Sequence, residues 1–361
     1  MPIALSSSVV TLLGSIPSPS SGLVTIGPLT IHYYGAAIAL GVLAAVWLAR
    51  KRWKARGGDP DDISNLALLC VPVGLIGTRI YHVITDYQKL YCGPPNCPKS
   101  LWPGAFEIWD GGLGIPGGIA AGVIAGLIFA RVKGMNVKVG YDSVAPAIPL
   151  AQAIGRWGNW FNQELFGRPT SLPWGLEIDP LHRPERYAAS PTFHPTFLYE
   201  SLWNLGVVAV ILAVDRRGRV KAGKLFPIYL GGYFLGRMWV EEMRSDNAAM
   251  VGPFRWNFLL SVIMIVVSLI WFFWGGALRS PGEAYPPAYV DGHRFAAGPD
   301  QLGSGAMGSG DQVDDGVGER GPDLEGPGPE PTPTQADDAE VAVGVEPPEG
   351  SGGTEVPDGP R

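Results

Sequence analysis

WNFLLSVIMIVVSLIWFFWG, residues Trp256–Gly275, is a run of twenty residues without a charged side chain. A helix needs about 20 mostly apolar residues to cross the hydrocarbon core of a bilayer. Two further uncharged stretches, Leu113–Ala130 and Ile31–Ala49, come close to this length. The three stretches predict membrane-spanning helices and exclude a chain that is soluble throughout.

Four weaker apolar segments lie among the uncharged ones, and each carries isolated polar residues. They are Leu66–Thr85 with Arg79, Tyr141–Trp157 with Asp142 and Arg156, Pro195–Val214 with Glu200, and Leu225–Glu242 with Arg237 and Glu241. Strong spans bracket them on both sides, so we expect them to cross the membrane rather than form buried soluble helices. The prediction is an all-α polytopic membrane protein with about seven transmembrane helices.

Charge is divided unevenly along the chain. Of the 33 acidic and 27 basic residues, 17 acidic and 3 basic ones lie in Ser280–Arg361, a net charge of −14 that leaves +8 for residues 1–279. The C-terminal part is rich in Gly and Pro, lacks hydrophobic periodicity and cannot bury enough apolar surface to offset its ordering entropy. We therefore expect a transmembrane domain over residues 1–279 and a disordered acidic tail over residues 280–361, with a short interaction motif in the tail as the alternative.

The loops between the predicted spans indicate the orientation. Three basic clusters follow the first, third and fifth spans: Arg50–Arg56, Arg131–Lys138 and Arg216–Lys224. Loops that remain in the cytoplasm carry an excess of Lys and Arg, so these clusters mark the cytoplasmic face. The N-terminus is then outside, and seven spans place the acidic tail in the cytoplasm.

The three cysteines suggest no metal centre. Cys92 and Cys97 lie in the predicted outer loop after the second span, where they are able to form a short disulfide. Cys70, within that span, is assigned to packing, because no His or second Cys pair stands near it in the sequence.

Nearly every ionisable residue inside the spans lies in the outer half of the predicted bundle, and only Asp142 lies at the inner end. Such residues are costly in a membrane and usually face a cavity, a partner or a substrate. Arg156 and Arg237 come from different helices. The guanidinium group of arginine is always charged and is able to donate two hydrogen bonds to one phosphate. Simple ion pairs of Arg156 with Glu164 and of Arg237 with Glu241 are the alternative. The glycine-rich stretch Gly111–Gly118 offers close backbone approach to an anion, although such stretches more often pack helices.

One segment carries a resemblance to a known family. Gly155–Gly167, GRWGNWFNQELFG, resembles the signature G-R-x-G-N-[FW]-x-N-x-E-x-x-G of the bacterial prolipoprotein diacylglyceryl transferases. Three shorter motifs agree in order: Tyr33-Tyr34-Gly35, His194–Glu200 (HPTFLYE, with Phe197 where the family has Gln) and Arg237–Arg244 (RMWVEEMR). The resemblance covers roughly residues 29–275 and does not include the tail.

The resemblance implies a seven-span enzyme of the bacterial plasma membrane with its active site toward the outer leaflet. Such an enzyme transfers the diacylglyceryl group of phosphatidylglycerol to the lipobox cysteine of a prolipoprotein signal peptide, forming a thioether and releasing glycerol phosphate. This is the first step of lipoprotein maturation. The family uses no metal or organic cofactor, and its partners are membrane lipid and prolipoproteins rather than nucleic acid.

The resemblance also implies roles for individual residues. Arg156 and Arg237 would hold the phosphate and stabilise its charge as it departs. Tyr34 and Asn159 would orient the headgroup, Glu164 would fix Arg156, and Glu241 would fix Arg237. Gly167 would let the outer loop turn closely. Tyr233 and Asp142 match further polar positions of the family, and a structural role is expected for Asp142 because it lies at the inner end.

The chain departs from the family pattern at Pro116. The family's glycine-rich motif often holds a histidine there, which has been the favoured general base for the thiol, whereas proline accepts no proton. Either His194 replaces that base, or the two arginines lower the thiol pKa enough that none is needed. Packing at the start of its helix is an equally good interpretation of His194.

Two other classes of protein compete with a transferase. A transporter or flippase for an anionic lipid or small organic anion would also suit paired intramembrane arginines and glycine-rich helices. An inverted repeat would favour it, and the sequence shows none. A non-catalytic lipoprotein chaperone is suggested by Pro116 alone.

Overall fold

The computed structural model describes residues 14–27, 29–92, 100–107, 111–112, 114–245 and 250–290. Its long helices are α1 (Tyr33–Ala55), α2 (Pro60–Thr85), α4 (Ile115–Val132), α6 (Ala147–Phe161), α7 (Thr196–Arg216), α8 (Leu225–Met243) and α9 (Trp256–Phe273). Shorter elements are α3 (Leu101–Gly104), α5 (Val137–Val144), a π-helical turn (Tyr87–Tyr91), two 3₁₀ turns (Pro180–His182, Glu185–Tyr187) and strands β1 (Leu23–Ile26), β2 (Leu29–His32), β3 (Leu176–Glu177), β4 (Thr192–Phe193), β5 (Met250–Val251) and β6 (Phe254–Arg255).

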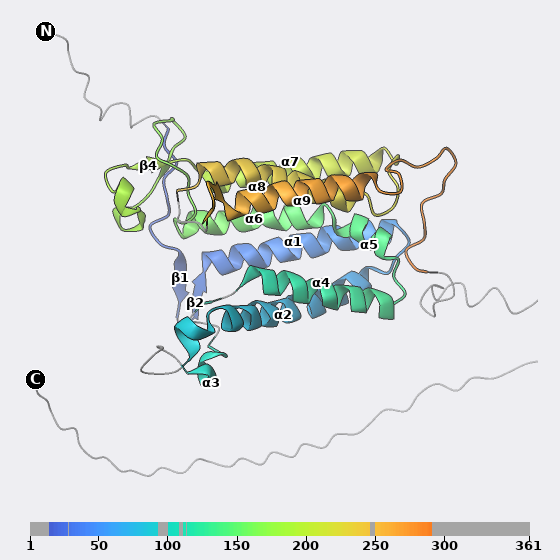
Figure 1. The fold of residues 1–361 in the computed structure, drawn as a ribbon, viewed down its shortest axis with the longest axis horizontal. Coiled ribbons are helices and arrows are strands. Elements are labelled where there is room, and N and C mark those ends of the chain that lie inside the picture. Colours follow the sequence, from blue (N-terminus) through green and yellow to red (C-terminus); the bar gives the residue numbers. More distant parts are fainter. Residues whose placement is uncertain are drawn as a thin grey trace, which may run out of the picture. The chain divides into compact units, whose positions relative to one another are not determined.

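The helices lie side by side with their axes nearly aligned (Figure 1). Packing proceeds from α4 to α2, from α2 to α1, and from α1 to α6, after which α7, α8 and α9 follow in chain order. The six strands form three antiparallel hairpins, β1–β2, β3–β4 and β5–β6. The first of these leads directly into α1, and the last leads directly into α9.

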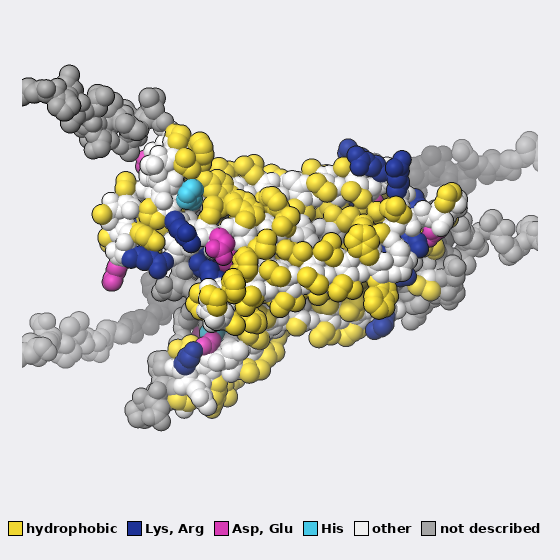
Figure 2. All heavy atoms as spheres, turned by 45° about the horizontal axis from the view of Figure 1, so that its top comes forward, with side chains coloured by type: hydrophobic (Ala, Val, Ile, Leu, Met, Phe, Trp, Pro, Cys, Tyr) yellow, Lys and Arg dark blue, Asp and Glu magenta, His cyan; other side chains and the backbone are white. Residues whose placement is uncertain are grey.

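Five helices within the described residues are long and apolar enough to cross a membrane: α1, α2, α4, α7 and α9. Figure 2 shows hydrophobic side chains covering the middle of the visible face, while Lys and Arg gather toward its two ends. This distribution is the one expected of a bundle surrounded by lipid. The prediction of a polytopic helical membrane protein is confirmed. The other two predicted spans, those of α6 and α8, fall outside these five and remain predictions.

The predicted span Tyr141–Trp157 is two helices rather than one. α5 ends at Val144, and α6 begins at Ala147 after a turn that contains Pro146. Proline lacks the amide hydrogen that a helix interior requires, and its ring clashes with the carbonyl four residues earlier. The prediction of a continuous span was therefore wrong, and α6 enters the bundle as a separate helix of 15 residues.

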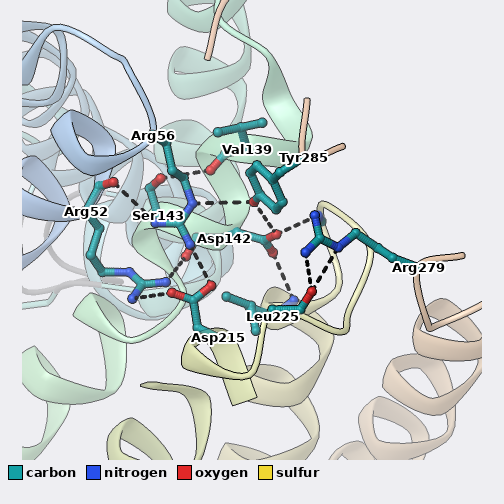
Figure 3. Close-up of polar contacts among 11 residues, drawn as sticks. Arg52, Arg56, Val139, Asp142, Ser143, Asp215, Leu225, Arg279 and Tyr285 are labelled. Atoms are coloured by element: carbon teal, nitrogen blue, oxygen red, sulfur yellow. Dashed lines mark hydrogen bonds and ion pairs between the residues drawn. The ribbon is translucent and has the colours of Figure 1, made fainter. Parts of the chain in front are cut away.

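Two aspartates tie the helices together at the end that holds the basic clusters (Figure 3). Asp215, in the last turn of α7, pairs with Arg52 at 3.2 Å and with Arg56 at 2.8 Å. Asp142 on α5 accepts hydrogen bonds from the backbone amides of Gly223 and Leu225 at 2.8 and 2.9 Å, where α8 begins. These contacts confirm the structural role expected of Asp142.

The chain beyond α9 packs back against this same end. We call residues 277–290 the C-terminal strap. Tyr285 donates a hydrogen bond to Asp142 Oδ2 at 2.7 Å, and Tyr289 donates one to Asp62 Oδ2 at 2.5 Å. Ala288, which is 3% exposed, packs in a cluster around Trp53.

The strap corrects one predicted boundary. We expected a disordered tail to begin at Ser280, but residues 280–290 are packed against the helices. The prediction relied on a composition averaged over 82 residues, which gives no weight to single side chains. Tyr285 and Tyr289 form hydrogen bonds to buried carboxylates, and these bonds attach the segment to the helices. Residues 291–361 lie outside the described residues, and so does Cys97, the predicted disulfide partner of Cys92.

Candidate active site

Five charged side chains from four elements form a chain of alternating sign at the other end of the bundle. Glu200 on α7 lies between Arg156 on α6, at 2.6 Å, and Arg237 on α8, at 3.7 Å. Arg237 also pairs with Glu241 one turn later, at 2.8 Å, as the sequence predicted. Glu241 in turn pairs with Arg255 Nε at 2.8 Å, where β6 passes into α9. We call these five residues the arginine–carboxylate network.

Burial makes the network a rigid feature. Glu241 is fully buried and Glu200 is 6% exposed, so both carboxylates are shielded from bulk water. Removing one member of such a set leaves an uncompensated buried charge, which is strongly destabilising. Within this network Arg156 and Arg237 are both in contact with Glu200, so two guanidinium groups lie close together at one end of the bundle.

Asn159 extends the network to Glu164. Its Oδ1 accepts a hydrogen bond from Arg156 Nη1 at 3.4 Å, and its Nδ2 donates one to Glu164 Oε1 at 2.8 Å. Within the described residues no ion pair joins Glu164 directly to Arg156, so that predicted pairing was wrong. The arginine takes Glu200 instead, because packing of α6 against α7 brings this carboxylate closer than the loop does.

Glu164 is held by an unusual loop after α6. Its neighbours Gln163 and Leu165 have φ values of 52° and 58°, a left-handed conformation that costs residues with a Cβ free energy. Polar contacts hold both residues in place. Gln163 Nε2 donates to Asp179 Oδ2 at 2.6 Å, and the Leu165 carbonyl accepts from the Thr196 hydroxyl at 2.5 Å. Backbone strain of this kind concentrates at functional sites.

Gly167 closes that loop against two other segments. A Cβ at this position would lie 2.7 Å from His194 Cβ and 3.2 Å from the Met243 carbonyl, so only glycine fits. The Gly167 amide donates to the His194 carbonyl at 2.9 Å. Gly167 thus permits the close approach of this loop to His194 and Met243.

His194 stands at the edge of the site rather than within the network. Its Nδ1 lies 3.3 Å from the Tyr199 hydroxyl, and its backbone binds both Gly167 and Arg168. Burial lowers the pKa of His194, which keeps the imidazole neutral at pH 7. Among the contacts of the described residues, none connects this ring to Arg156 or Arg237. The observed contacts are those of a packing residue.

Two predicted tyrosines lie close to the signature segment and to the second arginine. Tyr34 in the first turn of α1 packs against Gly158, where a Cβ would come within 2.7 Å of the Tyr34 ring. Tyr233 precedes Arg237 by one helical turn on α8, and its ring centroid is 6.2 Å from that of Tyr229. Tyr34 therefore lies against the signature segment, and Tyr233 lies on the same helix as Arg237.

Part of the glycine-rich stretch packs α4 against α2. A Cβ at Gly117 would clash with the Gly77 carbonyl and with Tyr81 on α2. Pro116 lies in the first turn of α4, where its missing amide hydrogen is tolerated. Arg79 donates to the carbonyls of Gly104 and Gly111, among others, and so organises the loop before α4.

Sequence reasoning missed two residues of the network. Glu200 was noted as a polar residue within a span, and its position at the end of the HPTFLYE motif was the available signal. Arg255 immediately precedes the uncharged stretch that begins at Trp256, and the sequence analysis did not single it out. Only the structure shows that the β5–β6 hairpin turns it back toward Glu241.

The fold and the site define a class of protein, namely a polytopic helical membrane protein with a partly buried network of arginines and carboxylates at one end of its bundle. Comparison with known proteins identifies the family. Residues 21–274 match the prolipoprotein diacylglyceryl transferase family, and the chain belongs to it.

Several relatives of known name support this assignment. A phosphatidylglycerol–prolipoprotein diacylglyceryl transferase of Streptomyces griseus is 43% identical over 287 residues, covering 78% of this chain and 86% of that protein. The proteins of the same name from Cutibacterium acnes and Corynebacterium glutamicum are 49% and 42% identical and cover 71% and 78% of this chain. These relatives give the transporter alternative no support.

Proposed function

We propose that this protein transfers the diacylglyceryl group of phosphatidylglycerol to the lipobox cysteine of prolipoproteins, as the first step of lipoprotein maturation. The observation that carries the proposal is the arginine–carboxylate network, built largely from the segments that match the family. In the reaction a sulfur–carbon bond forms as the carbon–oxygen bond to the phosphate breaks. The electron pair leaves with glycerol phosphate, and the thiol proton passes to solvent or to a base.

Arg156 and Arg237 are proposed to bind the phosphate and stabilise the charge that develops on it as glycerol phosphate leaves. Glu200 holds both guanidinium groups from one side, so their free N–H groups are aimed before substrate arrives. Such preorganisation in a water-poor site is often the largest catalytic effect. Tyr34 and Asn159 would orient the headgroup, and Tyr233 would border the lipid.

Thiol activation is proposed to come from the same arginines. A cationic environment lowers the pKa of a thiol and favours the thiolate, which is the nucleophile. Since Pro116 provides no base and the His194 ring already contacts Tyr199, a dedicated base is not required. Neither a metal nor an organic cofactor enters the proposed reaction.

We infer the orientation of the protein in the membrane from the positively charged loops. With α6 and α8 crossing as well, seven spans place the basic clusters in the cytoplasm and the N-terminus outside. The network then faces the outer leaflet of the bacterial plasma membrane, where prolipoprotein signal peptides emerge. Residues 291–361 would form a cytoplasmic tail.

The test uses the full-length protein in detergent with labelled phosphatidylglycerol and a lipobox peptide, and it measures release of glycerol phosphate. Arg237→Lys keeps the charge but loses the planar fork, so we expect a rate about 10²-fold lower. Arg217→Lys, at an exposed site beyond α7, is the matched control and should turn over normally. Failure of the wild-type protein to release glycerol phosphate from this pair of substrates would refute the proposal.

A further inference from the structure

A pocket of about 710 Å³ opens at the end of the bundle opposite the arginine–carboxylate network. It lies between α5, the start of α8 and the last turns of α9. Three lysines and three aromatic residues dominate its lining: Lys138, Lys221, Lys224, Tyr141, Trp271 and Trp274. Nothing in the proposed transferase reaction uses this pocket.

The walls of the pocket are amphipathic. Tyr141 packs edge-on against Trp271 with ring centroids 5.6 Å apart, and Phe226 supports both rings. Val267 and Ile270 continue the lining along α9, whose outer surface is apolar and exposed. The pocket therefore has a cationic end near the loops and an apolar side that opens toward the lipid-facing surface.

The lysines are only partly used by the fold. Lys224, which is 8% exposed, donates to the carbonyls of Trp271 and Trp274 at 2.7 Å each. Lys221 donates to the Gly275 carbonyl at 3.1 Å. An ammonium group has three donors, so Lys224 keeps one and Lys221 keeps two. These bonds explain why two lysines sit at the C-terminal end of α9, but they do not explain Lys138.

Three positive charges converge on this pocket, and one carboxylate, that of Glu283, shares its lining. Within the described residues, none of the three lysines forms an ion pair. Glu283 from the C-terminal strap also lines the pocket, and one of its carboxylate oxygens accepts from the Ser280 amide at 2.8 Å. Burial lowers the pKa of Lys224, and Lys221 and Lys138 lower it further. A bound anion would relieve this repulsion.

We propose that this pocket binds an anionic phospholipid. The phosphate headgroup would meet Lys138 and Lys221, and an acyl chain would lie along Val267 and Ile270. Basic pockets between membrane helices on the cytoplasmic side are suited to anionic headgroups, and the basic clusters place this end in the cytoplasmic leaflet. The site is separate from the transferase site and does not depend on the proposed activity.

The delipidated full-length protein is titrated with dioleoyl phosphatidic acid or with dioleoyl phosphatidylcholine. Native mass spectrometry then measures how many lipid molecules remain bound to each protein molecule. The double variant Lys138→Gln/Lys221→Gln leaves Lys224 and its capping bonds intact. Each lysine near an anionic headgroup contributes about a factor of five, so we expect about 30-fold weaker binding of one phosphatidic acid. Phosphatidylcholine binding should not change.

Two further variants decide the assignment. Lys51→Gln/Lys54→Gln removes the same charge from α1 at the same end of the bundle, outside the pocket, and should bind phosphatidic acid as the wild type does. Ile270→Trp keeps every lysine but fills the apolar side, and it should weaken binding of the same lipid. Equal losses in both lysine pairs, or unchanged binding in Ile270→Trp, would overturn the proposal.

Discussion

Glu200 is the residue on which the geometry of the site depends most. It is the carboxylate that touches both Arg156 and Arg237, although its own role is to position them rather than to contact substrate. Glu200→Gln keeps the shape but removes the charge, so both guanidinium groups lose their anchor. Because misplacement of a catalytic group by about 1 Å costs about 10²-fold, we expect a fall of that order in kcat with a smaller change in KM.

The measurement for Glu200→Gln is glycerol phosphate release as a function of phosphatidylglycerol concentration. Glu242→Gln is the matched control, because this exposed carboxylate follows Glu241 on α8. It should behave as the wild type. A Glu200→Gln protein with unchanged kcat would contradict a positioning role.

The rate of a His194→Ala variant distinguishes between the two ways in which the thiol could be activated. Its ring contacts Tyr199 and its backbone holds Gly167, so we expect His194→Ala to lose less than about 10-fold in rate. A positioned general base would be worth about 10²–10⁴-fold. The measurement is rate against pH for both proteins with the same lipobox peptide. Burial lowers the pKa of His194, so a base at this position would lose activity in the wild type as pH falls through that lowered value. A severe loss in His194→Ala that higher pH restores would make His194 the base.

At the scale of elements, α2 and α4 pack through glycines. A Cβ on Gly77 would lie 2.6 Å from the Gly117 carbonyl and would clash with Ala121, so the two backbones approach closely. Such contacts between small residues drive helix association in membranes. Gly77→Ala should therefore cost about 1–3 kcal/mol through overpacking.

The measurement for Gly77→Ala is thermal unfolding of the purified protein in detergent. A loss of this size corresponds to a Tm lower by several degrees, at about 2–4 °C per kcal/mol. Gly122→Ala is the control within the same helix pair, because its added Cβ would meet only the Cys70 carbonyl at 3.9 Å. Similar Tm values for the two variants would show that α2 and α4 move apart at little cost in free energy, which would contradict the prediction.

At the scale of the whole molecule, the sequence predicted what depends on local composition and periodicity. The uncharged stretches became α1, α4 and α9, and the basic clusters lie together around Asp142 and Asp215. Pairing between distant side chains was less predictable. Glu164 lies eight residues from Arg156 and was expected to bind it, yet the partner is Glu200, which packing of two helices brings near. Motif positions identify such residues, but only the packing of helices decides which charges meet.

We expect the C-terminal strap to stabilise the helical bundle. A protein that ends at Val290 keeps every strap contact, whereas one that ends at Arg279 loses the bonds of Tyr285 to Asp142 and of Tyr289 to Asp62. Each carboxylate is buried, so each lost partner costs about 1–3 kcal/mol. We expect the shorter protein to unfold several degrees lower, and the longer one to match the full-length protein.

The pH dependence of that difference has a definite sign. Burial and the bond to Asp62 raise the pKa of Tyr289 to about 12, above the value of about 10 for an unfolded tyrosine. Its contribution is therefore fully present below pH 10 and is lost as pH rises toward 12. The Tm difference between the two truncated proteins should stay constant from pH 6 to pH 9. Equal Tm values at pH 7 would show that the strap rests on the bundle without stabilising it.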